Sequence, residues 1–235
     1  MKIISLASSS AGNCYILDNG SSYLLLEAGL KYKDLIKELT KHGLKLTDFE
    51  HCLVSHSHKD HSVSINDLSR FMTIVASEPT LNGVKGKTFV IEPKKWVKLG
   101  EFQILSFETE HDCEGSLGFI IKSKEENLLF LTDTKYIKYS LKQIKFNHVM
   151  IECNYVDDVL ENIDLHPALA KRLINSHMSL TTCIKTLKSL DLSKCETIYL
   201  IHLSDRHANE EKMANEVMKA TGVATYICNK YGGIK

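Results

Sequence analysis

Short apolar runs alternate with amphipathic segments along most of the chain. Runs of about four to eight mostly apolar residues are typical of buried strands. They predict strands over Lys2 to Ala7, Cys14 to Leu17, Ser22 to Glu27, His51 to Ser55, Thr73 to Ala76, Thr88 to Ile91, Trp96 to Leu99, Phe102 to Glu108, Ser116 to Ile121, Asn127 to Thr132, His148 to Glu152, Thr197 to Ile201 and Ala224 to Cys228. Helical spacing predicts helices over Tyr32 to His42, Ile65 to Phe71, His166 to Ser176, Thr181 to Leu190 and Glu210 to Thr221. This order predicts an α/β (α+β) protein with two sheets packed face to face and helices outside.

The domain organisation follows from the length and from the lack of linkers. A chain of 235 residues fits one large domain or two small ones. It has only three prolines, no low-complexity segment and no internal repeat at solenoid periods. We therefore expect a single domain over residues 1–235. The pair Gly232-Gly233 predicts a loose tail at the end.

The amino-acid composition gives little information on the function of the protein. The 29 basic residues balance the 29 acidic ones, which neither indicates nor excludes a nucleic-acid partner. Seven cysteines without a C-x-x-C pair are typical of reduced thiols in a cytosolic protein. The apolar part of Met1 to Ala7 is too short for a signal peptide, and no run approaches the roughly 20 apolar residues of a membrane helix. We expect a cytoplasmic protein with no membrane partner.

One polar cluster stands directly after the apolar run Cys52-Leu53-Val54. The segment Ser55 to Ser62 places three imidazoles and one carboxylate within six positions, at His56, His58, Asp60 and His61. Histidine and carboxylate are ligands that zinc and similar divalent ions accept. Because a strand that ends in such a cluster can direct several ligands to one point, the H-x-H-x-D-H spacing predicts a metal site.

Three more ligand-type residues follow predicted strands. His111 comes after Phe102 to Glu108, Asp133 after the run that ends near Leu131, and His202 after Thr197 to Ile201. A single histidine at a strand end is usually a structural residue whose hydrogen bonds are satisfied. Together with the cluster, however, the three supply the number of ligands that two metal ions need.

The ordered set of motifs resembles that of the metallo-β-lactamase superfamily. The resemblance implies an αββα sandwich, with His56, His58 and His111 on one metal, Asp60, His61 and His202 on the other, and Asp133 as the bridge. It also implies two divalent ions, zinc by default, with manganese compatible with the oxygen ligands. The family usually has L-L-D-x-G after its third strand, where the aspartate supports the metal loop. Here the segment reads Leu25-Leu26-Glu27-Ala28-Gly29, so Glu27 is expected to support that loop with a longer side chain, and an ordinary exposed glutamate is the alternative.

Within the superfamily, the closest resemblance is to the YycJ/WalJ-type branch of small exonucleases. It is carried by the segments Leu6 to Cys14, Glu152-Cys153-Asn154, His177-Met178-Ser179 and His202 to Asp205. In nucleic-acid-processing members, a carboxylate and a histidine at the positions of Glu152 and His177 form a dyad that protonates the leaving oxygen. The alternatives are a metal-loop support for Glu152 and a residue beside a helix cap for His177. Ser10, Asn13 and Arg206 are candidate substrate contacts, and Ser10 and Asn13 could instead contact the metal ligands. The alternatives are a tight polar turn for the first two and a surface loop for Arg206.

These features favour a two-metal phosphodiesterase that hydrolyses nucleic acid, with a DNA exonuclease as the specific expectation. Asp60 is expected to accept a proton as well as to bind metal. The first alternative is a small-molecule metallo-hydrolase acting on a cyclic nucleotide or a thioester, and the second is a non-catalytic metal-bound adaptor. The expected partner is nucleic acid, DNA before RNA, and a homodimer is compatible with the sequence.

Overall fold

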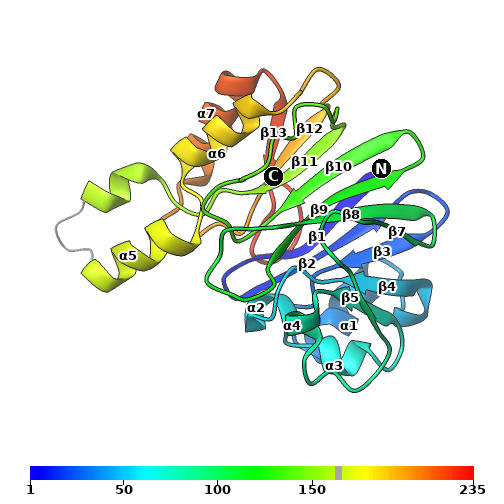
Figure 1. Ribbon diagram of the computed structural model, residues 1–235. Coiled ribbons are helices and arrows are strands. Elements are labelled where there is room, and N and C mark those ends of the chain that lie inside the picture. The colour runs from blue at the N-terminus through cyan, green and yellow to red at the C-terminus, as the bar shows by residue number, and fades with distance from the viewer. Residues whose placement is uncertain (162–165) are drawn as a thin grey trace.

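The computed structural model describes residues 1–161 and 166–235, and within them the strands form two sheets packed face to face (Figure 1). The first sheet has the order β1 (Lys2–Ser9), β2 (Gly12–Asp18), β3 (Tyr23–Leu26), β4 (Phe49–Leu53), β5 (Thr73–Ala76) and β6 (Thr88–Val90). The second has the order β13 (Ala224–Ile227), β12 (Thr197–Ile201), β11 (His148–Glu152), β10 (Glu126–Leu131), β9 (Leu117–Ser123), β8 (Phe102–Glu108) and β7 (Trp96–Leu99). Both sheets mix parallel and antiparallel pairs, so the predicted sandwich of two mixed sheets is confirmed.

Helices lie outside the two sheets, and α5 projects away from them (Figure 1). The helices are α1 (Tyr32–Lys41), α2 (Lys59–Ser62), α3 (Ile65–Leu68), α4 (Glu78–Leu81), α5 (Pro167–Ser176), α6 (Leu180–Ser189) and α7 (Glu210–Thr221), with short 3-10 turns at Leu46–Asp48 and Asp157–Glu161. The longer helices match the predicted ranges within two residues. The single turns α2 and α4 were not predicted, because four residues are too few to give a helical period. No helix in the described part of the chain is long and apolar enough to cross a membrane.

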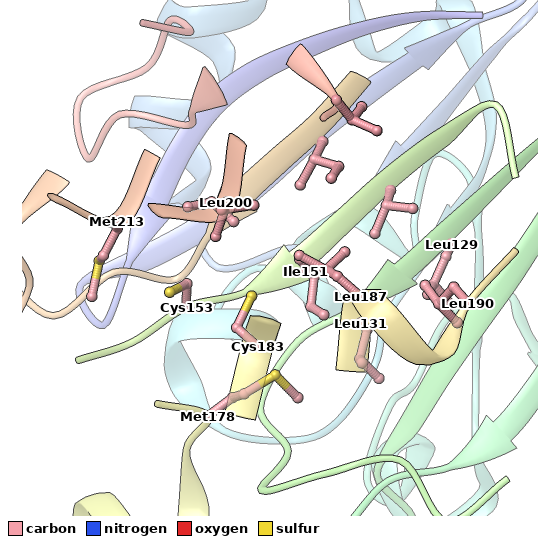
Figure 2. Close-up of a cluster of buried hydrophobic side chains, with 14 of the residues drawn as sticks. Leu129, Leu131, Ile151, Cys153, Met178, Cys183, Leu187, Leu190, Leu200 and Met213 are labelled. Atoms are coloured by element: carbon pink, nitrogen blue, oxygen red, sulfur yellow. The ribbon is translucent and has the colours of Figure 1, made fainter. Parts of the chain in front are cut away.

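The core has a layer between the sheets and one layer under each set of helices. Strand β10 shows why the apolar runs are continuous. Leu128 and Phe130 pack in the layer between the sheets, whereas Leu129 and Leu131 pack in the layer under α6 and α7. Successive side chains of a strand point to opposite faces, so a strand buried on both faces is apolar at every position. Figure 2 shows the layer under the helices, where Leu187 lies close to Leu131.

The C-terminal segment is ordered against the first sheet, so the prediction of a loose tail was wrong. Gly233 N donates to the carbonyl of Ser5 at 2.9 Å, and Ile227 and Lys235 exchange two backbone hydrogen bonds of 2.9 Å. Gly232 has φ 86°, and a Cβ atom there would lie 2.8 Å from the carbonyl oxygen of Leu6. The glycines therefore permit a close approach to β1 in place of a flexible end.

This docking gives a stability test. We expect Gly222→Ala to lower the free energy of unfolding by about 1 kcal/mol, because alanine is strained at φ 72° but meets no atom within 4 Å. Gly232→Ala has similar strain and also clashes with backbone, so we expect a loss of at least about 2 kcal/mol. Urea denaturation measures both variants. Equal losses would mean that the tail does not dock on β1.

Candidate metal centre

The ligand candidates converge where parallel strands end. Asp133 comes two residues after β10, Glu152 is the last residue of β11, and His202 follows β12 directly. These three strands are parallel neighbours, so their carboxyl ends meet at one edge of the second sheet. In the first sheet, β3 and β4 are also parallel neighbours. Glu27 follows β3, and the segment 54–58 follows β4 and leads into α2.

A first group consists of His56, His58, His111 and Asp133. His111 Nε2 lies 3.1 Å from His58 Nδ1 and 3.4 Å from Asp133 Oδ2. His56 Nε2 lies 3.6 Å from the same carboxylate oxygen. Ligands around a tetrahedral zinc bound at 2.0–2.1 Å are roughly 3.3 Å apart, which is close to these separations.

A second group consists of Asp60, His61, His202 and again Asp133. Asp60 Oδ2 lies 3.4 Å from His61 Nε2 and 3.2 Å from His202 Nε2. Asp133 Oδ1, the carboxylate oxygen that faces away from the first group, lies 3.5 Å from His61 Nε2. The two oxygens of Asp133 thus face two different sets of imidazoles, which is the arrangement a bridging ligand requires.

Contacts outside the two groups orient the imidazole rings. His111 Nδ1 donates to the carbonyl of Ser176 at 3.0 Å, and His56 Nδ1 pairs with Ser55 Oγ at 2.9 Å. His202 Nδ1 lies 3.1 Å from Glu152 Oε1. In His56 and His111 the Nε2 atom then faces the ligand group, while in His202 Nε2 faces Asp60 and Nδ1 also lies 3.0 Å from Asp133 Oδ1. Such outer partners fix the tautomer and the direction of metal-binding histidines.

The residues fit two divalent ions. His56 Nε2 is buried without a hydrogen-bond partner among the described residues, although it points at a carboxylate. An orphaned buried nitrogen costs free energy unless something occupies the space beside it. The first group is rich in nitrogen, which suits zinc, while the two carboxylates of the second group also accommodate manganese.

The carboxylates also decide how these imidazoles titrate without metal. Burial alone would lower the pKa of His202, but the surrounding carboxylates, Asp133 first, raise that pKa to about 10. Burial lowers the pKa of His56 well below its ordinary value, and the neighbouring imidazole of His61 lowers it further. A metal ion at the second group must therefore displace protons when it binds.

Three residues of the site adopt left-handed backbone that non-glycine residues rarely use. They are Glu27 at φ 64°, Asp133 at φ 41° and His202 at φ 54°, each just past the end of a strand. The conformation turns the chain sharply, so the side chain points to the site instead of continuing the strand. Backbone strain of this kind is typical of functional sites.

Glu27 reaches the metal loop in spite of its extra methylene. The carboxylate is fully buried, accepts from Ser55 N at 3.2 and 3.3 Å and lies 3.4 Å from His61 Nδ1. Its backbone N–H donates to Leu53 O at 2.9 Å. The side chain therefore links β3 to the loop that carries the histidines, and the alternative of an exposed glutamate does not hold.

Glu152 and His177 lie beside the second group. His177 Nδ1 and Glu152 Oε1 are 2.7 Å apart, while Glu152 Oε2 accepts from the backbone of Thr134 and Met178 at 3.0 and 3.1 Å. These two residues with Asp133 and His202 also form a third set of ligand-type atoms. We assign it no ion, because the hydrogen bonds of Glu152 already use both of its oxygens.

The candidate substrate contacts have different positions. Ser10, at the β1–β2 turn, and Arg206 are exposed and line a cavity of about 250 Å³ beside His177. Asn13 is fully buried, and its amide donates to the carbonyls of Ser9 at 2.9 Å and Asp60 at 3.2 Å. We therefore assign Asn13 to positioning the metal loop and not to substrate contact.

Comparison with known proteins decides the family. A model of the beta-lactamase superfamily domain matches residues 24–203. The chain belongs to this superfamily. It is 26% identical over 229 residues to the exodeoxyribonuclease WalJ of Streptococcus pneumoniae serotype 2 (strain D39), covering 91% of this chain and 85% of that one. It is 25% identical over 214 residues to the exodeoxyribonuclease YycJ of Bacillus anthracis, covering 85% and 81%.

Solved structures confirm the superfamily fold. The metallo-β-lactamase fold protein YhfI of Bacillus subtilis superposes with a TM-score of 0.77 at 15% identity, covering 99% of this chain and 98% of that one. Zinc-bound PqqB of Methylobacterium extorquens gives 0.71 at 12% identity, covering 100% and 99%. The resemblance to the superfamily and to its YycJ/WalJ-like branch is thus confirmed. Together with the His/Asp groups, these findings identify a metal-dependent hydrolase.

Two residues beside the metal groups, Tyr15 and Ser8, were not predicted from the sequence. The buried hydroxyl of Tyr15 donates to Ser8 Oγ at 2.8 Å, and Ser8 Oγ accepts from His202 N at 2.9 Å. Tyr15 Oη also lies 3.2 Å from Asn13 Oδ1. The phenol of Tyr15 therefore contacts Ser8, which accepts from the backbone of His202, and Asn13, which donates to the backbone of Asp60. Tyrosine in an apolar strand looks like core, so no pattern in the sequence singles it out.

This network gives a prediction for metal affinity. Tyr15→Phe keeps the ring but removes the hydroxyl, so we expect the second ion to bind about 10-fold more weakly, as is typical for loss of an outer partner. Calorimetric titration of metal-free protein with Zn²⁺ measures both binding steps. Tyr226→Phe, on half-exposed β13, is the matched control. Unchanged affinity in both variants would contradict a positioning role for Tyr15.

Proposed function

We propose that this protein is a two-metal phosphodiesterase that hydrolyses nucleic acid, specifically a DNA exonuclease. The observation that carries the proposal is the 2.7 Å contact between His177 Nδ1 and Glu152 Oε1 at the edge of the metal groups. Cleavage of a nucleic-acid phosphodiester releases an alkoxide, which needs a proton donor. The exodeoxyribonuclease names of the WalJ and YycJ relatives support DNA as the substrate.

The protonation of His177 suits the role of acid. Burial by itself would lower the pKa of His177, but the carboxylate of Glu152 raises that pKa above its ordinary value. Glu152 binds Nδ1, so Nε2 on the opposite side of the ring is the atom that can serve the substrate. His177 is then a proton donor whose orientation Glu152 fixes.

The remaining roles fall to the metal ligands. Two divalent ions bound by the two groups would supply Lewis-acid stabilisation of the phosphate charge and would lower the pKa of a shared water. Asp60 lies at the open side of the second group, with 21% of its side chain exposed. It can therefore accept a proton from the attacking water as well as bind metal.

The first experiment asks whether DNA is cleaved, and how. We expect the purified protein with Mn²⁺ or Zn²⁺ to shorten end-labelled duplex DNA by single nucleotides, because an exonuclease removes them one at a time from an end. Chelation by EDTA and the variant Asp60→Ala should both abolish the ladder, which is resolved on a denaturing gel. Hydrolysis of a cyclic nucleotide or thioester without any DNA cleavage would favour a small-molecule hydrolase. Absence of metal-dependent turnover on every substrate would favour a binding protein.

The second experiment isolates the acid. His177→Gln should lower kcat on an oligonucleotide by roughly 10²- to 10⁴-fold, the usual contribution of a positioned acid. On bis(p-nitrophenyl) phosphate the loss should be much smaller, because p-nitrophenolate leaves without a proton. The exposed His42 supplies the control His42→Gln. Equal losses on both substrates would contradict proton donation by His177.

A further inference from the structure

Two cavities flank the metal centre and differ in charge. One, of about 790 Å³, borders Ser57 between the ligands His56 and His58, and its only charged lining residues in the described chain are Glu78 and Glu114. The other, of about 250 Å³, borders His177 and is lined by Arg206, by His207 and by Asp205, whose carboxylate is paired with Lys230. The first lining repels the phosphates of a nucleic acid, whereas the second offers them a cation, Arg206.

We propose that the cavity beside His177 binds the nucleotide on the leaving side of the scissile phosphodiester, and that Arg206 binds the next phosphate of that nucleotide. This assignment rests on the proposed phosphodiesterase function and names its substrate contacts. His177 forms part of the cavity wall, and its Nδ1 is used by Glu152. Because Nδ1 is occupied and the residue lines the cavity, the proposal places the group that takes a proton from Nε2 in this cavity.

The chemistry of the step places the leaving nucleotide there. Water oxygen bonds to phosphorus, and a water proton passes to Asp60. The bond from phosphorus to the leaving oxygen breaks, and that oxygen keeps the electron pair and takes the proton of His177. The nucleoside attached to this oxygen then extends from the imidazole into the cavity.

The lining suits one nucleotide. Leu173 of α5 supplies an apolar wall for a sugar or base, and Ser10 and Ser204 supply hydroxyls. A volume of about 250 Å³ is slightly below the ~300–1,000 Å³ of typical small-ligand sites. This size is nearer to that of one nucleotide unit than to that of a base pair.

Arg206 supplies a guanidinium to the cavity. The neighbouring Asp205 is paired with Lys230, and within the described chain no carboxylate lies within 4 Å of the Arg206 guanidinium. A guanidinium forms paired, charge-assisted hydrogen bonds with a phosphate. The other polar side chains of the lining are two serines, Asn154, two histidines and Asp205, whose carboxylate is paired with Lys230, so a phosphate oxygen can serve as the anionic partner of Arg206.

The test compares two substrates in one set of variants. We expect Arg206→Gln to raise KM for a short oligonucleotide by roughly 10- to 100-fold, the worth of a charged hydrogen bond to phosphate. The loss on bis(p-nitrophenyl) phosphate, which has no second phosphate, should be at least 10-fold smaller. The salt slope of log KM for the oligonucleotide should fall by about 0.7, as for one lost contact to a single strand. Arg206→Lys should restore part of the affinity, because the charge returns without the planar fork.

Arg70→Gln is the matched control, since Arg70 is exposed beside α3, outside the residues that line this cavity. If Arg206→Gln raised KM for the oligonucleotide no more than Arg70→Gln did, the assignment of Arg206 would be overturned. Equal losses on both substrates would also overturn it, because Arg206 would then act on the scissile phosphate or on the fold. Wild-type protein that cleaves neither substrate would instead contradict the phosphodiesterase function itself. Thermal denaturation of each variant separates these outcomes from unfolding.

Discussion

The carboxylate of Asp133 is only 2% exposed and lies between two groups of imidazoles, with one oxygen directed at each. A buried carboxylate is strongly unfavourable unless cations or donors surround it. Its pKa is held well below the ordinary value by His202 and other imidazoles in spite of burial. Both sheets meet at this edge, so the imidazoles that follow β4, β8 and β12 can all surround the buried carboxylate.

The same requirement accounts for the strained backbone. Glu27, Asp133 and His202 use left-handed φ values that cost of order 1 kcal/mol or more each. Hydrogen bonds from outside the ligand set hold them in place: His202 N donates to Ser8, and Glu27 accepts from Ser55 N. The hairpin β1–β2 thus acts on the metal groups from the first sheet, although it contributes none of the seven ligand candidates. Rigid support of this kind is what positions catalytic groups accurately.

The sequence predicted those parts of the site that depend on strand ends. Asp133 and His202 were recognisable because each follows an apolar run, and parallel strands bring such ends together without any knowledge of side-chain packing. The role of Tyr15 was not predictable, because it depends on the register Tyr15↔Leu26 and Tyr15↔Ser5 across three strands. The docked tail was missed for a similar reason: Gly232 looks flexible until the carbonyl of Leu6 is known to lie beside it. Of the two expectations for Asn13, contact with a phosphate or with the metal ligands, its buried amide is placed for the second.

The metal groups and the cavity beside His177 are built from different parts of the fold. The ligand groups and the pair Glu152–His177 belong to strand ends or to segments tied to them by hydrogen bonds, so they can vary little without loss of metal. The cavity beside His177 is built mainly from the turn at Ser10, from α5 and from the segment 204–207, which follows β12 as an irregular stretch. Loops tolerate substitution far better than buried strands. The two sheets therefore constrain the metal groups, while the residues that line the cavity, such as Arg206, lie where the sheets do not constrain them.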